Sequence, residues 1–145
     1  MKRLFTHCLL VTMLMVLGLT TATAQKSVLD ESFESGKPAG WAAGDYWEFG
    51  NGYAQFAALF ADGADTLFTP MLDISELDNQ PSVVIAYSLA ENNGNVNELK
   101  VLYRASEEAA WSVWKTFNAA TEGEESVKDV LPGSMKNVQI AIAGS

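Results

Sequence analysis

The chain has 145 residues, the size of one ordinary domain, and its 18 acidic and 9 basic side chains give a formal net charge of −9. This charge argues against nucleic acids and anionic lipid surfaces as partners, because their phosphates need a basic surface on the protein. It is compatible with a soluble protein and with cation binding.

The first 24 residues have the features of a cleavable signal peptide. Two basic residues precede an apolar run at residues 8–19, and residues 22–24 read Ala-Thr-Ala, which is a small-x-small cleavage pattern. The run is shorter than the roughly 20 residues of a transmembrane helix, and Cys8 lies at its start, whereas a lipoprotein needs a cysteine at its end. We therefore expect a secreted chain, periplasmic or extracellular, that begins near Gln25 without membrane insertion or a lipid anchor.

Removal of this leader changes the available chemistry. Lys2 and Arg3 leave with it, so the formal net charge becomes −11, against −9 for the whole chain. His7 and Cys8 are the only histidine and the only cysteine, so residues 25–145 contain neither type. Without them there is no Ser-His-Asp triad, no Cys-His pair, no histidine-ligated zinc and no disulfide. We therefore expect a protein that is not an enzyme.

Beyond residue 25 the sequence predicts short strands joined by turns, which is typical of an all-β sandwich. Apolar residues alternate or form short runs closed by Gly, Pro, Asn or Asp. Asn51-Gly52 is a strong hairpin turn. Residues 82–90 are apolar on both faces and predict a strand in the middle of a sheet, covered on both sides. The expected strands lie at residues 28–33, 53–60, 66–69, 82–90, 98–104, 111–117, 127–131 and 138–142.

Residues 98–117 predict a hairpin with a loop at residues 105–110. Counted with the two-residue period of a strand, Trp111 falls on the core side of the hairpin. Trp114 falls on the outer side, among polar neighbours, where Arg104 is placed to lie over its ring. We therefore expect Trp114 and Arg104 to contact a ligand.

Other aromatic residues have two interpretations. Tyr46 and Tyr53 are candidates for stacking on sugar rings or for anchoring a protein partner. A packed core is the simpler explanation for most of the rings, including Trp41 and Trp47, because a sandwich needs large side chains between its sheets.

The order of features along residues 33–145 resembles a known family. The segments are FESGKPAGW, YW, GY, DTLFTPMLDIS, ELKVLYRASEEAAWSVWKTF and LPGSMKNVQIAIAGS. Together they resemble the cleaved-adhesin or choice-of-anchor J family, whose members occur in secreted and surface proteins of oral and gut bacteria. The resemblance implies an antiparallel jelly-roll β-sandwich, MAM-like in fold and similar to galactose-binding domains, over residues 25–145.

The family pattern continues beyond the point where this sequence stops. Members usually add a glycine-rich turn, a closing strand with an aspartate, and an anchor domain, whereas this chain stops at Ser145. We expect a module that is incomplete at its C-terminus and has an open sheet edge. Such an edge favours pairing with another chain, including homo-oligomer formation.

Calcium is the one cofactor that the resemblance suggests, as a structural ion held partly by an acid near the F-E-x-G start. That position corresponds to Glu34, and Asp62, Asp65 or Asp45 are further loop carboxylates toward the six to eight oxygens that calcium takes. No EF-hand spacing is present, and acids solvated in turns are the alternative.

Other polar groups give weaker indications. The adjacent acids Glu107-Glu108 and Glu124-Glu125 would suit a glycosidase only if two carboxylates faced each other across a cleft. The asparagines of residues 91–98 fit turn chemistry. We therefore expect a secreted, non-catalytic binding module of adhesin type that contacts extracellular proteins or glycans. The alternatives are a carbohydrate-active enzyme or its accessory carbohydrate-binding domain, and a truncated copy without independent function.

Overall fold

The computed structural model describes residues 26–57, 63–77, 80–92 and 95–145, and every regular element within these ranges is a β-strand. The predicted all-β class is therefore confirmed. The part of the chain that is described has no helix long and apolar enough to cross a membrane. In chain order the strands are β1 (Ala42–Ala43), β2 (Trp47–Gly50), β3 (Tyr53–Phe56), β4 (Asp65–Phe68), β5 (Leu72–Asp73), β6 (Ser82–Tyr87), β7 (Glu91–Asn92), β8 (Asn95–Val96), β9 (Leu99–Arg104), β10 (Ser112–Phe117), β11 (Glu125–Val130) and β12 (Asn137–Gly144).

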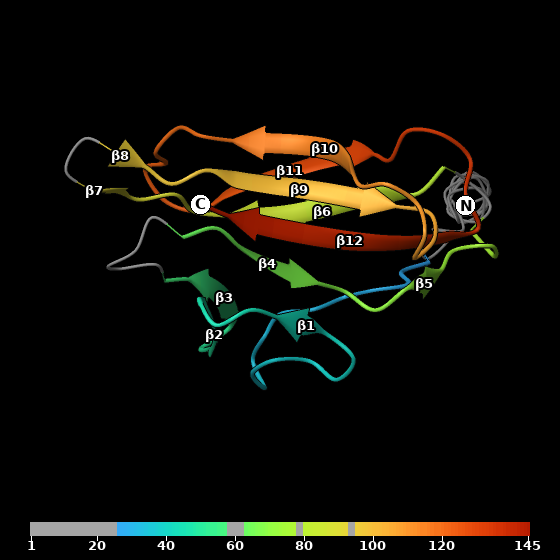
Figure 1. The fold of residues 1–145 in the computed structure, drawn as a ribbon, viewed down its shortest axis with the longest axis horizontal. Helices are drawn as coiled ribbons and strands as arrows, with labels where there is room; N and C mark the ends of the chain where they lie inside the picture. The colour runs from blue at the N-terminus through green and yellow to red at the C-terminus, as the bar shows by residue number, and fades with distance from the viewer. Residues whose placement is uncertain (1–25, 58–62, 78–79, 93–94) are drawn as a thin grey trace, which may run out of the picture.

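One large antiparallel sheet dominates the molecule. Its strand order is β1-β4-β12-β9-β10, and β5 pairs with the start of β12. In Figure 1 the long strand β12 runs between β4 and β9, and β6 and β11 overlap with this sheet in projection. The remaining strands form the pairs β11-β6, β2-β3 and β7-β8. Side chains of the large sheet and of β6 share one core, so the arrangement is consistent with a β-sandwich.

The larger core lies between the large sheet and the β6-β11 pair. Val101 of β9 is 0 % exposed, and Val138 and Ile140 alternate along β12 toward the same side. Val83 and Ile85 of β6 pack against them from the other layer. The strand predicted at residues 138–142 from alternating apolar residues is therefore confirmed, and its apolar side faces the core.

A second core lies where the β2-β3 hairpin meets β4. Trp41, Trp47 and Leu67 are its buried members, which confirms the core interpretation of the two tryptophans. The hairpin turns at Asn51 and Gly52, with φ values of 55° and 84°. Two consecutive positive φ angles are what a two-residue hairpin turn with the twist of the strands requires, so this prediction is confirmed too.

Two predicted strand assignments are wrong. Residues 28–33 form no strand, because the Glu31 carboxylate accepts a hydrogen bond from the Phe33 backbone N–H at 2.7 Å, and Phe33 has a φ of 57°. The pattern of residues 82–90 predicts a central strand, but within the described ranges β6 pairs with β11 alone. Its outward residues are exposed, Val84 by 57 %.

Candidate functional site

The β9-β10 hairpin contains a β-bulge that reverses the expected positions of the two tryptophans. Val113 lies opposite Leu102 and Lys115 lies opposite Val101, so Trp114 is an extra residue in β10. A bulge breaks the two-residue period, and every residue before it changes face. Trp111 therefore turns outward, and so does Val113, which is 55 % exposed.

Trp114 lies against the core, contrary to its predicted place on the outer face. Its ring packs on the larger core, and its indole Nε1–H donates a hydrogen bond to the Val130 carbonyl at 3.1 Å. Val130 is in β11, so the side chain connects the edges of the two layers. The expected stack of Arg104 on Trp114 is absent, and the cation above the Trp114 ring is Lys115, at 5.5 Å.

Arg104 lies over Trp111 instead. The guanidinium carbon is 4.5 Å from the centroid of the Trp111 ring, and the Phe68 ring lies 5.7 Å from Trp111 at an angle of 41°. Two hydrogen bonds also fix the Arg104 guanidinium: Nε donates to Gln139 Oε1 at 2.8 Å, and Nη1 donates to the Glu107 carbonyl at 2.6 Å. Among the hydrogen bonds of the described residues none uses Nη2, which leaves that nitrogen for a ligand acceptor.

These residues lie on the outward face of the large sheet. One row of cross-strand neighbours runs across β4, β12, β9 and β10, and it consists of Phe68, Ala141, Leu102 and Val113. Ala141 is only 1 % exposed, and its neighbours on the two adjacent strands are the larger Phe68 and Leu102. We name as the outer-face cluster the five residues Phe68, Leu102, Arg104, Trp111 and Val113.

Of the predicted ligand-contacting residues, the structure brings only Arg104 into this cluster. Tyr46 is 37 % exposed and meets Phe56 edge-on at 6.3 Å, beside the smaller core. Tyr53, 51 % exposed, begins β3 next to the Asn51-Gly52 turn. No aromatic contact joins these two tyrosines to each other or to the cluster within the described ranges.

The predicted calcium ligands are not gathered in the described part of the chain. Asp65 uses both carboxylate oxygens locally, accepting from the backbone N–H groups of Tyr46 at 2.8 Å and Thr66 at 2.6 Å. Glu34 is exposed near Gly52, and Asp62 lies outside the described residues. Within those residues no three acids, histidines or cysteines form a group suited to a metal ion. Calcium binding stays a prediction of the resemblance.

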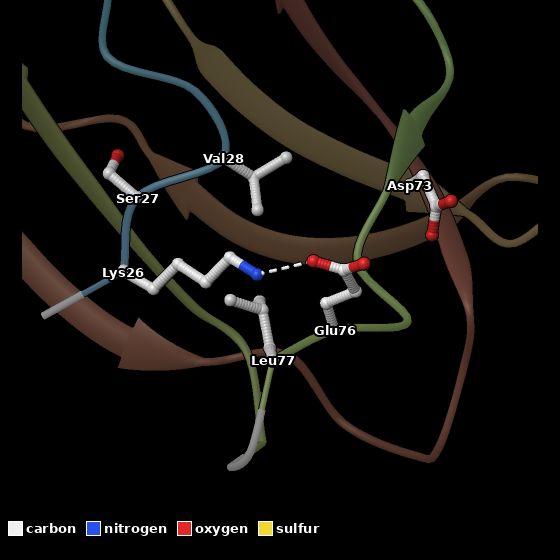
Figure 2. A pocket seen from close by; sticks show the side chains of 6 residues that line it. All are labelled: Lys26, Ser27, Val28, Asp73, Glu76 and Leu77. Atoms are coloured by element: carbon white, nitrogen blue, oxygen red, sulfur yellow. Dashed lines mark hydrogen bonds and ion pairs between the residues drawn. The ribbon is translucent and has the colours of Figure 1, made fainter.

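Two hollows lie away from the cluster. The first, about 290 Å³, is formed where residues 26–28 pass the turn after β5, and Figure 2 shows the Lys26 ammonium reaching Glu76 across it at 2.7 Å. Both side chains of this ion pair are largely exposed, so it adds little to stability. Hydrogen bonds from Ser75 lower the pKa of Asp73 beside it.

The second hollow, about 220 Å³, lies at one end of β6, β10 and β11. The Tyr87 and Phe117 rings are 4.1 Å apart there, and the Tyr87 hydroxyl donates to Glu125 Oε2 at 2.9 Å. That hydrogen bond raises the pKa of Tyr87. Asn118 and Thr121 complete a wall of rings, amide and hydroxyl groups, which is the usual chemistry of sugar binding.

An ion pair between Lys115 of β10 and Asp129 of β11 is expected to make the stability of the fold depend on pH. Lys115 Nζ lies 2.6 Å from Asp129 Oδ2, and this hydrogen bond is the main reason why the pKa of Asp129 is below its ordinary value of 3.8. A lowered folded-state pKa stabilises the fold above the unfolded-state pKa, and that contribution is lost as pH falls through the folded-state value. In NMR titrations we expect the Asp129 pKa to rise in Lys115→Met; an unchanged pKa would contradict the pairing.

No protein-family model matches the chain, and the comparison with curated proteins finds no match either.

The sequence pattern does not indicate that Phe68 and Gln139 lie at this cluster or that Trp111 faces outward. The bulge that turns Trp111 outward occurs in a segment, residues 112–117, with no glycine or proline to indicate it. Phe68 and Gln139 reach the cluster from β4 and β12, which are adjacent to the hairpin only through sheet pairing.

Proposed function

We propose that the protein is a non-catalytic binding module that contacts another protein through the outer-face cluster. The observation that carries this proposal is the Arg104 guanidinium held 4.5 Å over the ring of Trp111 by two further hydrogen bonds. Tryptophan and arginine are the residue types most enriched among those that dominate protein–protein binding energy. A fixed guanidinium also loses little conformational entropy when it pairs with a partner carboxylate.

The shape of the surface supports a protein partner. The cluster spans a row of four strands and forms no part of either hollow, whereas small-molecule sites are concave. Val113 exposes 55 % of its surface at one end of the row, which adds apolar area beside the stacked rings. We propose further that the module is an adhesin-type jelly roll that acts outside the cytoplasm, as the leader-like residues 1–24 and the resemblance suggest.

A binding screen with matched variants tests this function. The chain is presented to a panel of purified extracellular-matrix and serum proteins, and hits are measured by surface plasmon resonance. We expect Trp111→Ala and Arg104→Ala each to weaken binding at least about tenfold. Tyr53→Ala, which removes an exposed ring on β3, serves as the control and is expected to bind as the wild type does. Equal binding by all four proteins would overturn the proposed surface.

Glycan binding is the second candidate, favoured by the hollow that Tyr87, Phe117, Asn118, Thr121 and Glu125 line. A glycan array on the same variants separates the two candidates. Glycan binding that is lost in Phe117→Ala and kept in Trp111→Ala would assign the function to this hollow. Hydrolysis of any polysaccharide by the purified protein would overturn the non-catalytic proposal.

A further inference from the structure

Strand β6 has an open edge. It pairs with β11 over its whole length of six residues without a register shift, and within the described ranges no strand pairs with its other side. Its exposure alternates, with Val83 and Ile85 turned to the core and Val84 57 % exposed on the outside. An unpaired edge presents a row of backbone donors and acceptors to any strand that can lie beside it.

The outer strands β1 and β10 of the large sheet, and β11 of the smaller layer, have features that discourage pairing. Strand β10 carries the bulge and Lys115, and β1 has only two residues. The far side of β11 is protected by charge and by two side chains of β10, since β11 carries Glu125, Lys128 and Asp129, Trp114 donates to the Val130 carbonyl and Lys115 pairs with Asp129. Charges, bulges and short strands are the usual protections of sheet edges. Strand β6 reads SVVIAY, with no charge, no proline and no bulge, so it lacks all of them.

We propose that β6 pairs antiparallel with β6 of a second copy of this chain, across a two-fold axis. The two pairs then join into one four-stranded sheet, β11-β6-β6-β11. This stabilises the smaller layer of each copy, because a sheet of only two strands is marginally stable by itself. A second copy fits this edge because β6 complements itself: its alternation lets core-facing residues meet core-facing residues of another β6, and none of its side chains is charged, so no like charges face each other. The net charge of −9 repels the two copies elsewhere and therefore limits the strength of the pair.

The register follows from the alternation of β6. Residues that face each other across an antiparallel pair lie on the same side of the sheet. A two-fold pairing must therefore match core-facing with core-facing positions, which excludes the register that would pair all six residues. With Val84 opposite Val84 of the partner subunit, Val83 meets Ile85 of the partner subunit on the core side. This register leaves Tyr87 outside the paired segment, with its contacts to Phe117 and Glu125 intact.

The strength of the pair is limited by its size. Five paired residues on each copy bury less than the roughly 1,200 Å² of a stable, specific interface. We therefore expect a dimer that forms and dissociates with concentration, in the micromolar range or weaker, and does not survive dilution.

Sedimentation of the full chain over a concentration series is the first test. We expect the average mass to rise from one copy toward two. The variant Val84→Lys places a charge at the centre of the pair and is expected to remain a monomer throughout. The control Val113→Lys changes a valine of nearly equal exposure, 55 % against 57 %, on the protected edge strand β10, and is expected to dimerise as the wild type does. Monomers at every concentration, or a dimer lost in the control and kept in Val84→Lys, would overturn the proposal.

Cross-linking tests the register. In a Cys8→Ser background the chain has no cysteine, so Val84→Cys introduces a single thiol. Opposed residues of an antiparallel pair lie about 4.5 to 5.5 Å apart at Cα, within the range that a disulfide spans. Mild oxidation is expected to give a covalent dimer with Val84→Cys and none with Val113→Cys. Equal yields from the two variants, or no dimer from Val84→Cys, would overturn this pairing.

A peptide competition distinguishes a second copy from another occupant. If alternate β6 amide hydrogens become protected from exchange only when a synthetic apolar strand peptide is added, the edge accepts a strand of a different protein and the proposal is wrong. We expect the protection to grow with the concentration of the chain alone. The dimer is independent of the outer-face cluster, so Trp111→Ala is expected to dimerise even where it loses its protein partner.

Discussion

Trp114→Ala is expected to lower the free energy of unfolding by about 3 kcal/mol, in the range found when a large core aromatic residue is truncated. The ring packs on the larger core, and its Nε1–H donates to the Val130 carbonyl at 3.1 Å, so the variant loses apolar contacts and one link between the layers. Because the side chain is half-buried, the expected loss is at the lower end of that range. Urea unfolding at neutral pH measures it.

Trp111→Ala is the matched control for this prediction. Trp111 is the other tryptophan of the same hairpin, but it lies outside both buried clusters and contacts Arg104 and Phe68 on the outward face. We expect it to cost about 1 kcal/mol, the usual worth of a surface aromatic and cation–π contact. The opposite order, with Trp111→Ala more destabilising than Trp114→Ala, would contradict the bulge in β10.

Thr69→Val is expected to destabilise the protein by about 2 kcal/mol, although the two side chains have nearly the same shape. Thr69 is 3 % exposed, and its hydroxyl donates to the Pro70 carbonyl at 2.8 Å and accepts from the backbone N–H of Ile140 at 3.0 Å. Valine leaves that buried N–H without its acceptor, and an unsatisfied buried donor costs about 1–3 kcal/mol.

Thr69→Ser separates the hydroxyl from the methyl group. Serine keeps both hydrogen bonds and loses one buried methyl, so we expect it to cost about 1 kcal/mol and to be more stable than valine. Thermal unfolding of the two variants beside the wild type gives the order. A valine variant as stable as the wild type would mean that another group satisfies the Ile140 N–H.

Much of the fold followed from local pattern. The strands predicted at residues 66–69, 98–104, 111–117, 127–131 and 138–142 are present with small changes at their ends. These strands are marked by alternating apolar residues, by Gly and Pro at their boundaries and by the Asn51-Gly52 turn. Such signals depend on neighbouring residues only, so they can be recognised in the sequence. The strand predicted at residues 28–33 is absent for a similarly local reason. The Glu31 carboxylate accepts a hydrogen bond from the Phe33 backbone N–H, and this contact competes with an extended backbone.

The candidate site was only partly predictable. Arg104 was correctly placed on the outward face and correctly matched with a tryptophan of the hairpin, but with the wrong one. One inserted residue in β10 exchanges the faces of Trp111 and Trp114, and no glycine or proline announces it. Phe68 and Gln139 join Arg104 and Trp111 from distant parts of the sequence, at positions that depend on the pairing of β4 and β12 with β9.

Local sequence patterns are sufficient to predict the all-β class, most strand positions, the main hairpin turn and the alternation along β12. These depend on backbone preferences and on the two-residue period, both of which act within a strand. Contacts between strands determine which tryptophan faces the core and which strand lies at an edge. A face is set by the register against a neighbour, and an edge is defined by the strands that lie beside it. The apolar pattern of β6 would be the same whether the strand lay in the middle of a sheet or at its edge, so the pattern alone does not distinguish the two positions.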